Sequence, residues 1–263
     1  RAVEAYAPAS LLKPLTSFVL LEEGYSSPSE RFACSASINY GGRNWLNWAG
    51  FHRGNYTSVE AIADSCNTYY WNAALNTPQF STGWAPFAQD LMASARLFGM
   101  GSQIGVGLPE EKPGRVPNEE WKRQATGEPW YPGFTLNSVI GQGDILATPL
   151  QMLQLTTALA SDGQFIEPHL ISHIAGEAVE AERHAISGRH WDVIREGMVR
   201  MITDHGSNRY LGRPAGFNVT IAGKTGTAEF GSSGAAHAWF TGFAPADDPQ
   251  IAVAVIVELF APT

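Results

Sequence analysis

The sequence is poor in lysine, cysteine and charge, and it has no long apolar run. Charged residues make up 16% of its 263 residues, and the formal net charge is −8. Such a chain lacks the positive surface that nucleic acid binding needs, so we expect no nucleic acid partner. The longest apolar run, Ile251 to Val257, is far shorter than the roughly 20 residues that cross a bilayer. Arg1 to Ser10 lacks the apolar stretch of a signal peptide, which leaves open an anchor outside this sequence.

The two cysteines and seven histidines exclude little by themselves. One pair, Cys34 and Cys66, cannot define a disulfide framework. The sequence permits a disulfide between them but does not supply its geometry, so we expect two separate buried thiols. The histidines show no metal-ligand spacing. The nearest pair, His169 and His173, lies in a segment that looks like strand or loop, and we expect both on the surface, with no metal and no cofactor.

Several helices are clearly predicted by the sequence. Thr57-Ser58-Val59-Glu60 and Thr148-Pro149-Leu150-Gln151 have capping-box spacing and predict helices that run to about Asp64 and Ser161. Further helices are predicted over Leu11 to Glu22, Thr68 to Leu75, Leu91 to Phe98 and Ser187 to His205. Two segments look irregular: Ser26 to Tyr56, with short strands, and Glu110 to Gly143, with four prolines and five glycines.

From Phe217 onward the pattern changes to β. Phe217 to Gly223, His237 to Ala244 and Ile251 to Glu258 are strand-like, and the turn Pro245 to Pro249 predicts that the last two form an antiparallel hairpin. We therefore predict one α+β domain over residues 1–263, with an antiparallel sheet flanked by helices. A helical part, roughly residues 25–210, separates the first helix from the strands of residues 217–258.

One of only four lysines closes the sole Ser-x-x-Lys string, Ser10-Leu11-Leu12-Lys13. A serine hydroxyl is a weak nucleophile and needs a base. Residues i and i+3 of a helix share a face, so the Lys13 amine can reach the Ser10 hydroxyl. The amine must be neutral, which burial and a second positive charge such as Lys224 both favour by lowering its pKa. Alone, the Ser-x-x-Lys string is weak evidence for a catalytic serine, because the same string also occurs at ordinary helix starts whose lysine is solvated.

Ser-x-Asn occurs twice, as Ser37-Ile38-Asn39 and Ser65-Cys66-Asn67. Turn chemistry explains either one. We favour the second because it follows a well-capped helix and could be held rigidly. Ser65 would then relay protons, and Asn67 would bind a substrate amide.

Lys224-Thr225-Gly226-Thr227 is the rarest of the three strings. On a strand, Lys224 and Gly226 point to one face and Thr225 to the other. Gly226 would let a substrate backbone approach closely, while Lys224 and a threonine hydroxyl bind its carboxylate. The bland alternative is an ordinary strand end with a polar turn.

The three strings in this order are typical of serine β-lactamases and penicillin-binding proteins. The sequence resembles the transpeptidase domain of a penicillin-binding protein over nearly the whole chain. The resemblance rests on five stretches: Tyr6 to Pro14, Ala61 to Tyr70, Gly141 to Met152, Ala222 to Ala228 and His237 to Pro245. The segment from Glu111 to Pro117, with Trp121, Trp130 and Gly133, is most similar to the class B, elongation-type enzymes.

The resemblance implies a β-lactamase/transpeptidase-like fold with an all-helical subdomain, and a D,D-transpeptidase that cross-links peptidoglycan stem peptides. It implies Ser10 as nucleophile and target of β-lactams, Lys13 as base, and Ser65 and Asn67 in support. Lys224, Thr225 and Thr227 would hold the substrate carboxylate, and the backbone N–H groups of Ser10 and Thr227 would form the oxyanion hole. It also implies an extracytoplasmic location, an anchor absent from this chain, and cell-elongation membrane proteins as partners.

Three departures from the family accompany the resemblance. Only nine residues precede Ser10, where the family has strands, and the chain ends just after a strand, where the family has a helix. We therefore expect a fold truncated at both ends. Ala9 also replaces the glycine that commonly precedes the nucleophile.

Three rival functions share these strings. A class A β-lactamase needs a Glu-x-x-Leu-Asn string, which this chain lacks, and a class D enzyme usually has Ser-x-Val at Ser65. A β-lactam sensor domain acylates and signals. The stretch Gly141 to Met152 favours the transpeptidase over lactamase and sensor alike, and the intact strings argue against an inactive scaffold.

Overall fold

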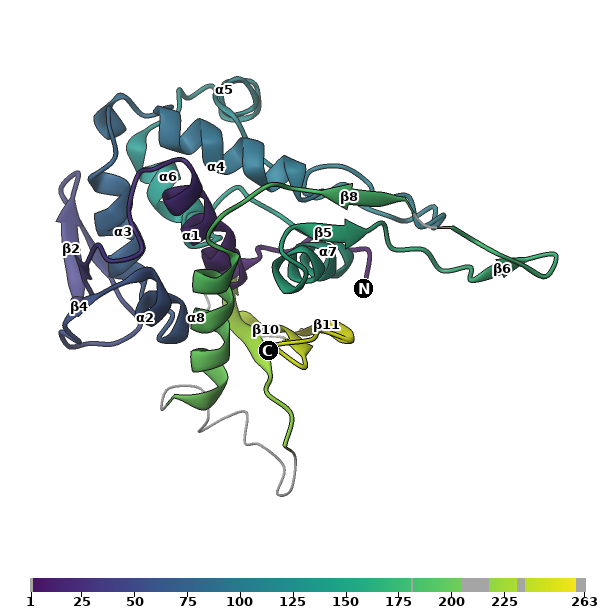
Figure 1. Ribbon diagram of the computed structural model, residues 1–263. Coiled ribbons are helices and arrows are strands. Elements are labelled where there is room, and N and C mark those ends of the chain that lie inside the picture. The colour runs from purple at the N-terminus through teal and green to yellow at the C-terminus, as the bar shows by residue number, and fades with distance from the viewer. Residues whose placement is uncertain (1, 181, 205–217, 231–234, 259–263) are drawn as a thin grey trace.

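The computed structural model describes residues 2–180, 182–204, 218–230 and 235–258. Its first helix lies at the centre of the molecule (Figure 1). A 3₁₀ turn, η1 (Ala9–Leu12), leads directly into α1 (Lys13–Glu22), and the predicted helix is confirmed. Pro14 is tolerated because it lies in the first turn of α1, where backbone N–H groups have no acceptor within the helix. Residues 13–21 are all buried, so neighbours surround α1.

The other predicted helices are present. Both capping boxes form, with the side chains of Thr57 and Thr148 and their partners Glu60 and Gln151 bonding reciprocally. These helices are α2 (Ser58–Ala63), α3 (Asn67–Leu75), α4 (Pro86–Leu97), α7 (Pro149–Ala160) and α8 (Trp191–Thr203). The last residue predicted for α8, His205, lies outside the described residues.

The segment Glu110 to Gly143 is less irregular than predicted. It contains α5 (Glu119–Thr126) and α6 (Pro132–Ser138). Asn118 caps α5 by accepting from the backbone N–H of Trp121, and a left-handed Gly127 ends it. These signals are present in the sequence, but the frequent prolines and glycines obscure them.

The C-terminal strands form one antiparallel sheet in the order β11-β10-β9. The predicted hairpin of β10 (Ala235–Ala244) and β11 (Ile251–Val257) is confirmed. The strand predicted over Phe217 to Gly223 was wrong. Phe217 lies outside the described residues, residues 218–221 are not in a strand, and β9 runs over Ala222–Phe230. The Lys-Thr-Gly-Thr string therefore lies inside a strand that pairs along its length with β10.

Helices pack on this sheet. α7 contacts β10 and β11, while α8 and the turn η1 contact β9. At the centre of the core, the Phe18 ring of α1 stacks on Trp191 of α8 at 4.4 Å and meets Phe98, which follows α4, edge-on at 5.7 Å. Helix α1 thus contacts α4 and α8 directly, and it is connected to the sheet through η1.

Small elements fill the periphery. Four two-stranded antiparallel sheets pair β1 (Phe32–Ala33) with β4 (Asn55–Tyr56), β2 (Ser37–Tyr40) with β3 (Arg43–Leu46), β5 (Gln164–Ile166) with β8 (Arg183–Ala185), and β6 (His173–Ile174) with β7 (Glu177–Ala178). A short turn, η2 (Phe80–Thr82), precedes α4. The β6–β7 hairpin extends from the body as an arm (Figure 1), and His169 and His173 are exposed as predicted.

The helical part predicted for residues 25–210 contains α2 to α8. Since α7 and α8 also pack on the sheet, a separate subdomain with these limits stays a prediction. Within the described ranges, no helix combines the length and the hydropathy that crossing a bilayer requires.

Candidate active site

A cleft of about 940 Å³ opens where the turn η1, the junction of α2 with α3, and strand β9 meet. Two of the eight residues singled out from the sequence, Lys13 and Lys224, have no exposed surface and lie behind its wall. The other six line it: Ser10, Ser65, Asn67, Thr225, Gly226 and Thr227. The fold therefore brings the three strings together. Their chemical roles stay predictions.

The turn that carries Ser10 is closely held by backbone from two distant segments. Ala9 has φ +51°, a left-handed conformation that favours glycine, and its N–H donates to the Gly141 carbonyl at 2.8 Å. A Cβ on Gly141 would lie 2.0 Å from the Ala9 carbonyl oxygen. A Cβ on Gly226 would lie 3.2 Å from the Leu11 side chain. We expected Gly226 to admit a substrate backbone, and in the structure its missing side chain admits the turn that carries Ser10.

The Lys13 amine connects the first string to the second. Its Nζ lies within hydrogen-bonding distance of the Ser65 carbonyl (2.6 Å), the Ser65 hydroxyl (3.1 Å) and the Asn67 Oδ1 (2.6 Å). In the described part of the chain the Ser10 hydroxyl makes no hydrogen bond, so the amine is directed at Ser65 and Asn67 rather than at Ser10. Catalytic contacts are often long before substrate binds and tighten in the complex.

Burial controls the charge of both lysines. It lowers the pKa of Lys13 well below its ordinary range, and the charge of Lys224 lowers it further. Burial also lowers the pKa of Lys224 to about 7, against an opposing effect of the Asp64 carboxylate. Burial and the neighbouring lysine both act in the predicted direction, and the neutral state of Lys13 stays a prediction. A neutral amine has a lone pair that can take a proton, which a charged one lacks.

Ser65 occupies a backbone position that normally takes glycine. After α2, the Cys66 N–H donates to the Ala61 carbonyl (3.1 Å) and the Ser65 N–H to the Ile62 carbonyl (3.2 Å). This is the Schellman pattern, whose residue in the left-handed region is usually glycine. Ser65 has φ +54°. The strained turn aims its carbonyl and its hydroxyl at Lys13, and strain of this kind clusters at functional sites.

The expectation of two separate thiols was wrong, because Cys34 and Cys66 form a disulfide with a Cα–Cα distance of 6.0 Å. The two residues are 32 apart in sequence, and only the fold brings them within bonding geometry. The bridge ties the middle residue of Ser65-Cys66-Asn67 to the segment that leads into β2.

Strand β9 presents its string in the predicted alternation. Lys224 and Gly226 are buried, Thr225 is half-buried and Thr227 is exposed. The Lys224 amine donates to the Thr225 carbonyl at 3.1 Å. The two threonines therefore face the cleft, and the Lys224 amine lies behind the strand. Their binding of a carboxylate stays a prediction.

Sequence reasoning missed several cleft residues. Gln142 donates from Nε2 to the Thr227 carbonyl at 3.1 Å and so joins the segment that holds Ala9 to β9. The β2–β3 hairpin supplies one wall through residues 43–46, followed by Asn47 and Trp48. Gln142 belongs to a stretch already quoted for the family resemblance. The hairpin carries a local signal that was overlooked: Gly41-Gly42, with φ +60° and +73°, forms the two-residue turn between β2 and β3.

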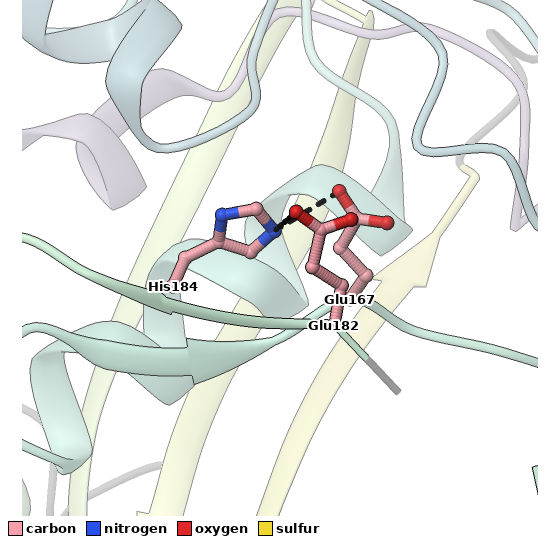
Figure 2. Close-up of side chains that lie close together, drawn as sticks. All are labelled: Glu167, Glu182 and His184. Atoms are coloured by element: carbon pink, nitrogen blue, oxygen red, sulfur yellow. Dashed lines mark hydrogen bonds and ion pairs between the residues drawn. The ribbon is translucent and has the colours of Figure 1, made fainter. Parts of the chain in front are cut away.

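A second cavity of about 580 Å³ lies between β5, β8 and α8, lined by residues such as Asp162 and Arg195, and holds none of the predicted residues. One group of side chains in the described ranges could hold a cation: Glu167, Glu182 and His184, at the β5–β8 pair (Figure 2). His184 Nε2 lies 3.1 Å from the Glu167 carboxylate and 4.0 Å from that of Glu182. Glu182 is exposed and Glu167 is half-buried, and the histidine already has a partner. None of the three lines the cleft.

Residues 2–259 match the family model described as penicillin binding protein transpeptidase domain. The chain belongs to this family. It is 32% identical to the peptidoglycan D,D-transpeptidase MrdA of Acinetobacter baumannii, over 98% of this chain and 40% of that protein. Among solved structures, it is similar to Pseudomonas aeruginosa PBP2 in complex with WCK 5153, with 34% identity and a TM-score of 0.85 over 98% of this chain and 55% of the other.

The PBP2–MreC complex from Helicobacter pylori is similar as well, with 28% identity and a TM-score of 0.81, over 97% of this chain and 46% of the PBP2 chain. The predicted family and fold class are therefore confirmed. This penicillin-binding transpeptidase domain spans about half, or less, of each of these relatives.

Proposed function

We propose that this chain is the catalytic domain of a D,D-transpeptidase, which cross-links peptidoglycan stem peptides through an acyl-enzyme on Ser10. The observation that carries the proposal is the convergence of the three strings on one cleft, with the buried Lys13 amine bonded to Ser65 and Asn67. Relatives named peptidoglycan D,D-transpeptidase support it.

In the acylation step, the Ser10 oxygen attacks the carbonyl carbon of the penultimate D-Ala. Its proton passes to neutral Lys13, whose lowered pKa makes the neutral form available. The developing oxyanion accepts hydrogen bonds from the backbone N–H groups of Ser10 and Thr227. Thr225 and Thr227, with Lys224 behind them, hold the terminal carboxylate, and Asn67 binds the peptide amide.

The tetrahedral intermediate then loses the terminal D-Ala. Its C–N bond breaks, and the proton held by Lys13 reaches the departing nitrogen through the Ser65 hydroxyl, which lies 3.1 Å from the amine. An acceptor amine attacks the Ser10 ester, forms the new amide and returns the proton to Ser10. A β-lactam would follow the first half of this path and stop at the ester.

The disulfide supports an extracytoplasmic location. Structural disulfides persist in oxidising compartments and are rare in the cytosol. We propose that the domain works on the outer side of the cytoplasmic membrane, anchored by a segment outside this sequence. The similar PBP2–MreC complex supports cell-elongation membrane proteins as partners of the whole protein.

Intact-protein mass spectrometry with benzylpenicillin tests the nucleophile. We expect a mass gain of one penicillin that persists for many minutes and is absent from Ser10→Ala. An adduct that is unaffected by Ser10→Ala, or no adduct at all, would overturn the assignment of Ser10. Rapid loss of the adduct with antibiotic turnover would instead indicate a β-lactamase.

A peptide assay separates the transpeptidase from a β-lactam sensor. With a stem pentapeptide that ends in D-Ala-D-Ala and an excess of a D-amino acid acceptor, the transpeptidase releases D-Ala and forms the exchanged peptide. A sensor domain forms the penicillin adduct but releases no D-Ala, and that result would contradict the proposal.

A further inference from the structure

The second string is tied to the cleft wall by two buried links, neither of which takes part in the steps above. Cys66, between Ser65 and Asn67, is bonded to Cys34, and both cysteines have no exposed surface. The backbone around Cys34 is itself fixed, since its N–H donates to the Gly54 carbonyl and its carbonyl accepts from the Arg53 N–H, both at 2.8 Å. The disulfide therefore ends in a well-anchored segment.

Asn47 makes the second link. Its Oδ1 accepts from the backbone N–H of Asn67 (3.0 Å), and its Nδ2 donates to the Ser35 carbonyl (3.1 Å). The same Nδ2 lies 3.6 Å from the sulfur atoms of Cys34 and of Cys66. Asn47 is 7% exposed, so its amide lies almost wholly inside the junction.

The N-terminus of α3 explains why this contact matters. The N-cap residue of α3 is Cys66, which makes no side-chain cap because its sulfur is in the disulfide. The first N–H of the helix, that of Asn67, would otherwise lack a partner. Asn47 supplies that acceptor from a distant segment, whereas an N-cap side chain would bond to the second or third N–H of the helix. It thereby fixes the residue whose Oδ1 accepts from Lys13 at 2.6 Å.

We propose that Asn47 and the Cys34–Cys66 disulfide are positioning elements that hold Ser65 and Asn67 against Lys13, so that acylation of Ser10 requires the oxidised protein. Ser65 is in the left-handed region, where serine is strained, and the turn relaxes when its tether to residues 34–47 is cut. The Lys13 amine then loses its two partners on Ser65, and its partner on Asn67 is no longer held in place. This inference rests on the proposed acylation of Ser10.

The test compares acylation rates of folded variants. The second-order rate constant for benzylpenicillin is expected to fall at least about tenfold in the double variant Cys34→Ser, Cys66→Ser, and in Asn47→Ala. Asn47→Asp keeps the oxygen acceptor for Asn67 and should recover most of the loss. Asn72→Ala is the matched control, because Asn72 also ties α3 to the β1 segment, through the Ala33 carbonyl at 3.0 Å, without touching the second string. It should acylate like the unmodified protein.

Two readouts separate positioning from loss of stability. The loss should appear in the acylation rate constant rather than in the penicillin concentration at half-saturation. The acid limb of the pH profile should also move to lower pH, because acceptors stabilise protonated Lys13 and their loss lowers its pKa. A lower melting temperature with an unchanged profile would contradict the positioning role.

Reduction provides a test without mutation. A phosphine reductant supplies two electrons and, with two protons from water, converts the disulfide to two thiols. Because the bond is buried, the reduction needs long incubation or mild denaturant, followed by thiol counting. Reduced protein should acylate slowly, and the same treatment should leave the double variant unchanged. Normal acylation by the reduced protein and by Asn47→Ala would overturn this inference alone, whereas failure of the untreated protein to acylate would overturn the proposed function as well.

Discussion

Ser65 has a backbone conformation that favours glycine over serine. It fills the glycine position of a helix end with φ +54°, and what serine adds there is a hydroxyl 3.1 Å from the Lys13 amine. Replacement by glycine removes the hydroxyl and relieves the strain together, so function and stability should change in opposite directions.

We predict that Ser65→Gly slows acylation by about 10²- to 10⁴-fold, the usual contribution of a proton-transfer group. The free energy of unfolding should rise by about 1 kcal/mol, because glycine is unstrained in the left-handed region. Stopped-flow acylation and urea denaturation measure the two effects. Gln79→Gly is the control, since Gln79 is exposed, has φ +57° and lies outside the cleft. A Ser65→Gly protein that acylates normally would remove Ser65 from the proton path.

Gly141 is required by close approach as well as by its backbone conformation. Its φ is +72°, and a Cβ there would lie 2.0 Å from the Ala9 carbonyl oxygen. Gly141→Ala should lower the free energy of unfolding by at least about 2 kcal/mol and disturb the Ser10 turn. Gly24→Ala separates the two causes, because Gly24 has φ +71° and a Cβ on it would meet nothing within 4 Å. Equal losses of stability in the two variants would refute the role of the close contact.

At the scale of elements, the sequence predicts those features that depend on residues close together in the chain. Helices α2 and α7 begin where their capping boxes predict, because a cap is a contact between residues three apart. The start of β9 and the Cys34–Cys66 bond were missed, because pairing with β10 and a contact across 32 residues depend on the fold. The three strings were found because each is local, whereas Asn47 acts on Asn67 from 20 residues away.

The cap of α7 offers a test of that local control. Thr148 accepts from the Gln151 N–H at 3.2 Å, and Gln151 accepts from the Thr148 N–H at 2.9 Å. Thr148→Ala should lower the free energy of unfolding by about 1 kcal/mol and leave benzylpenicillin acylation unchanged, since α7 supplies no cleft residue. Thr148→Ser, which keeps the acceptor, should behave like the unmodified protein. An alanine variant of full stability would show that tertiary packing alone fixes the start of α7.

At the scale of the whole molecule, the helical body and the sheet meet around two amines that have no exposed surface. Lys13 lies on α1 and Lys224 on β9. Burying an amine disfavours its charged form, so the assembled fold lowers the pKa of both. Burying the two amines therefore lowers the free energy of unfolding at neutral pH, and such a loss is typical of active sites.

That cost predicts a pH dependence. The pKa of Lys224 falls from 10.5 to about 7 on folding. Between these values the unfolded chain binds more protons than the folded one, so the free energy of unfolding should rise as pH increases through that window. Below about pH 7 both states are protonated at Lys224, and the destabilisation is present in full. Lys224→Met has no such group and should be more stable at pH 7, by an amount on the order of a few kcal/mol, while losing acylation.

Urea denaturation of both proteins at intervals from about pH 6 to about pH 9 gives the test. The stability difference between Lys224→Met and the unmodified protein should shrink with pH, because only the latter releases the proton on folding. Groups that Lys224 does not influence cancel in that difference. Lys13 does not cancel, because the charge of Lys224 lowers its pKa, so both lysines contribute to the change with pH. A difference independent of pH would mean that Lys224 keeps its charge when buried. The carboxylate site would then hold a permanent cation, and acylation should show no alkaline loss near pH 7.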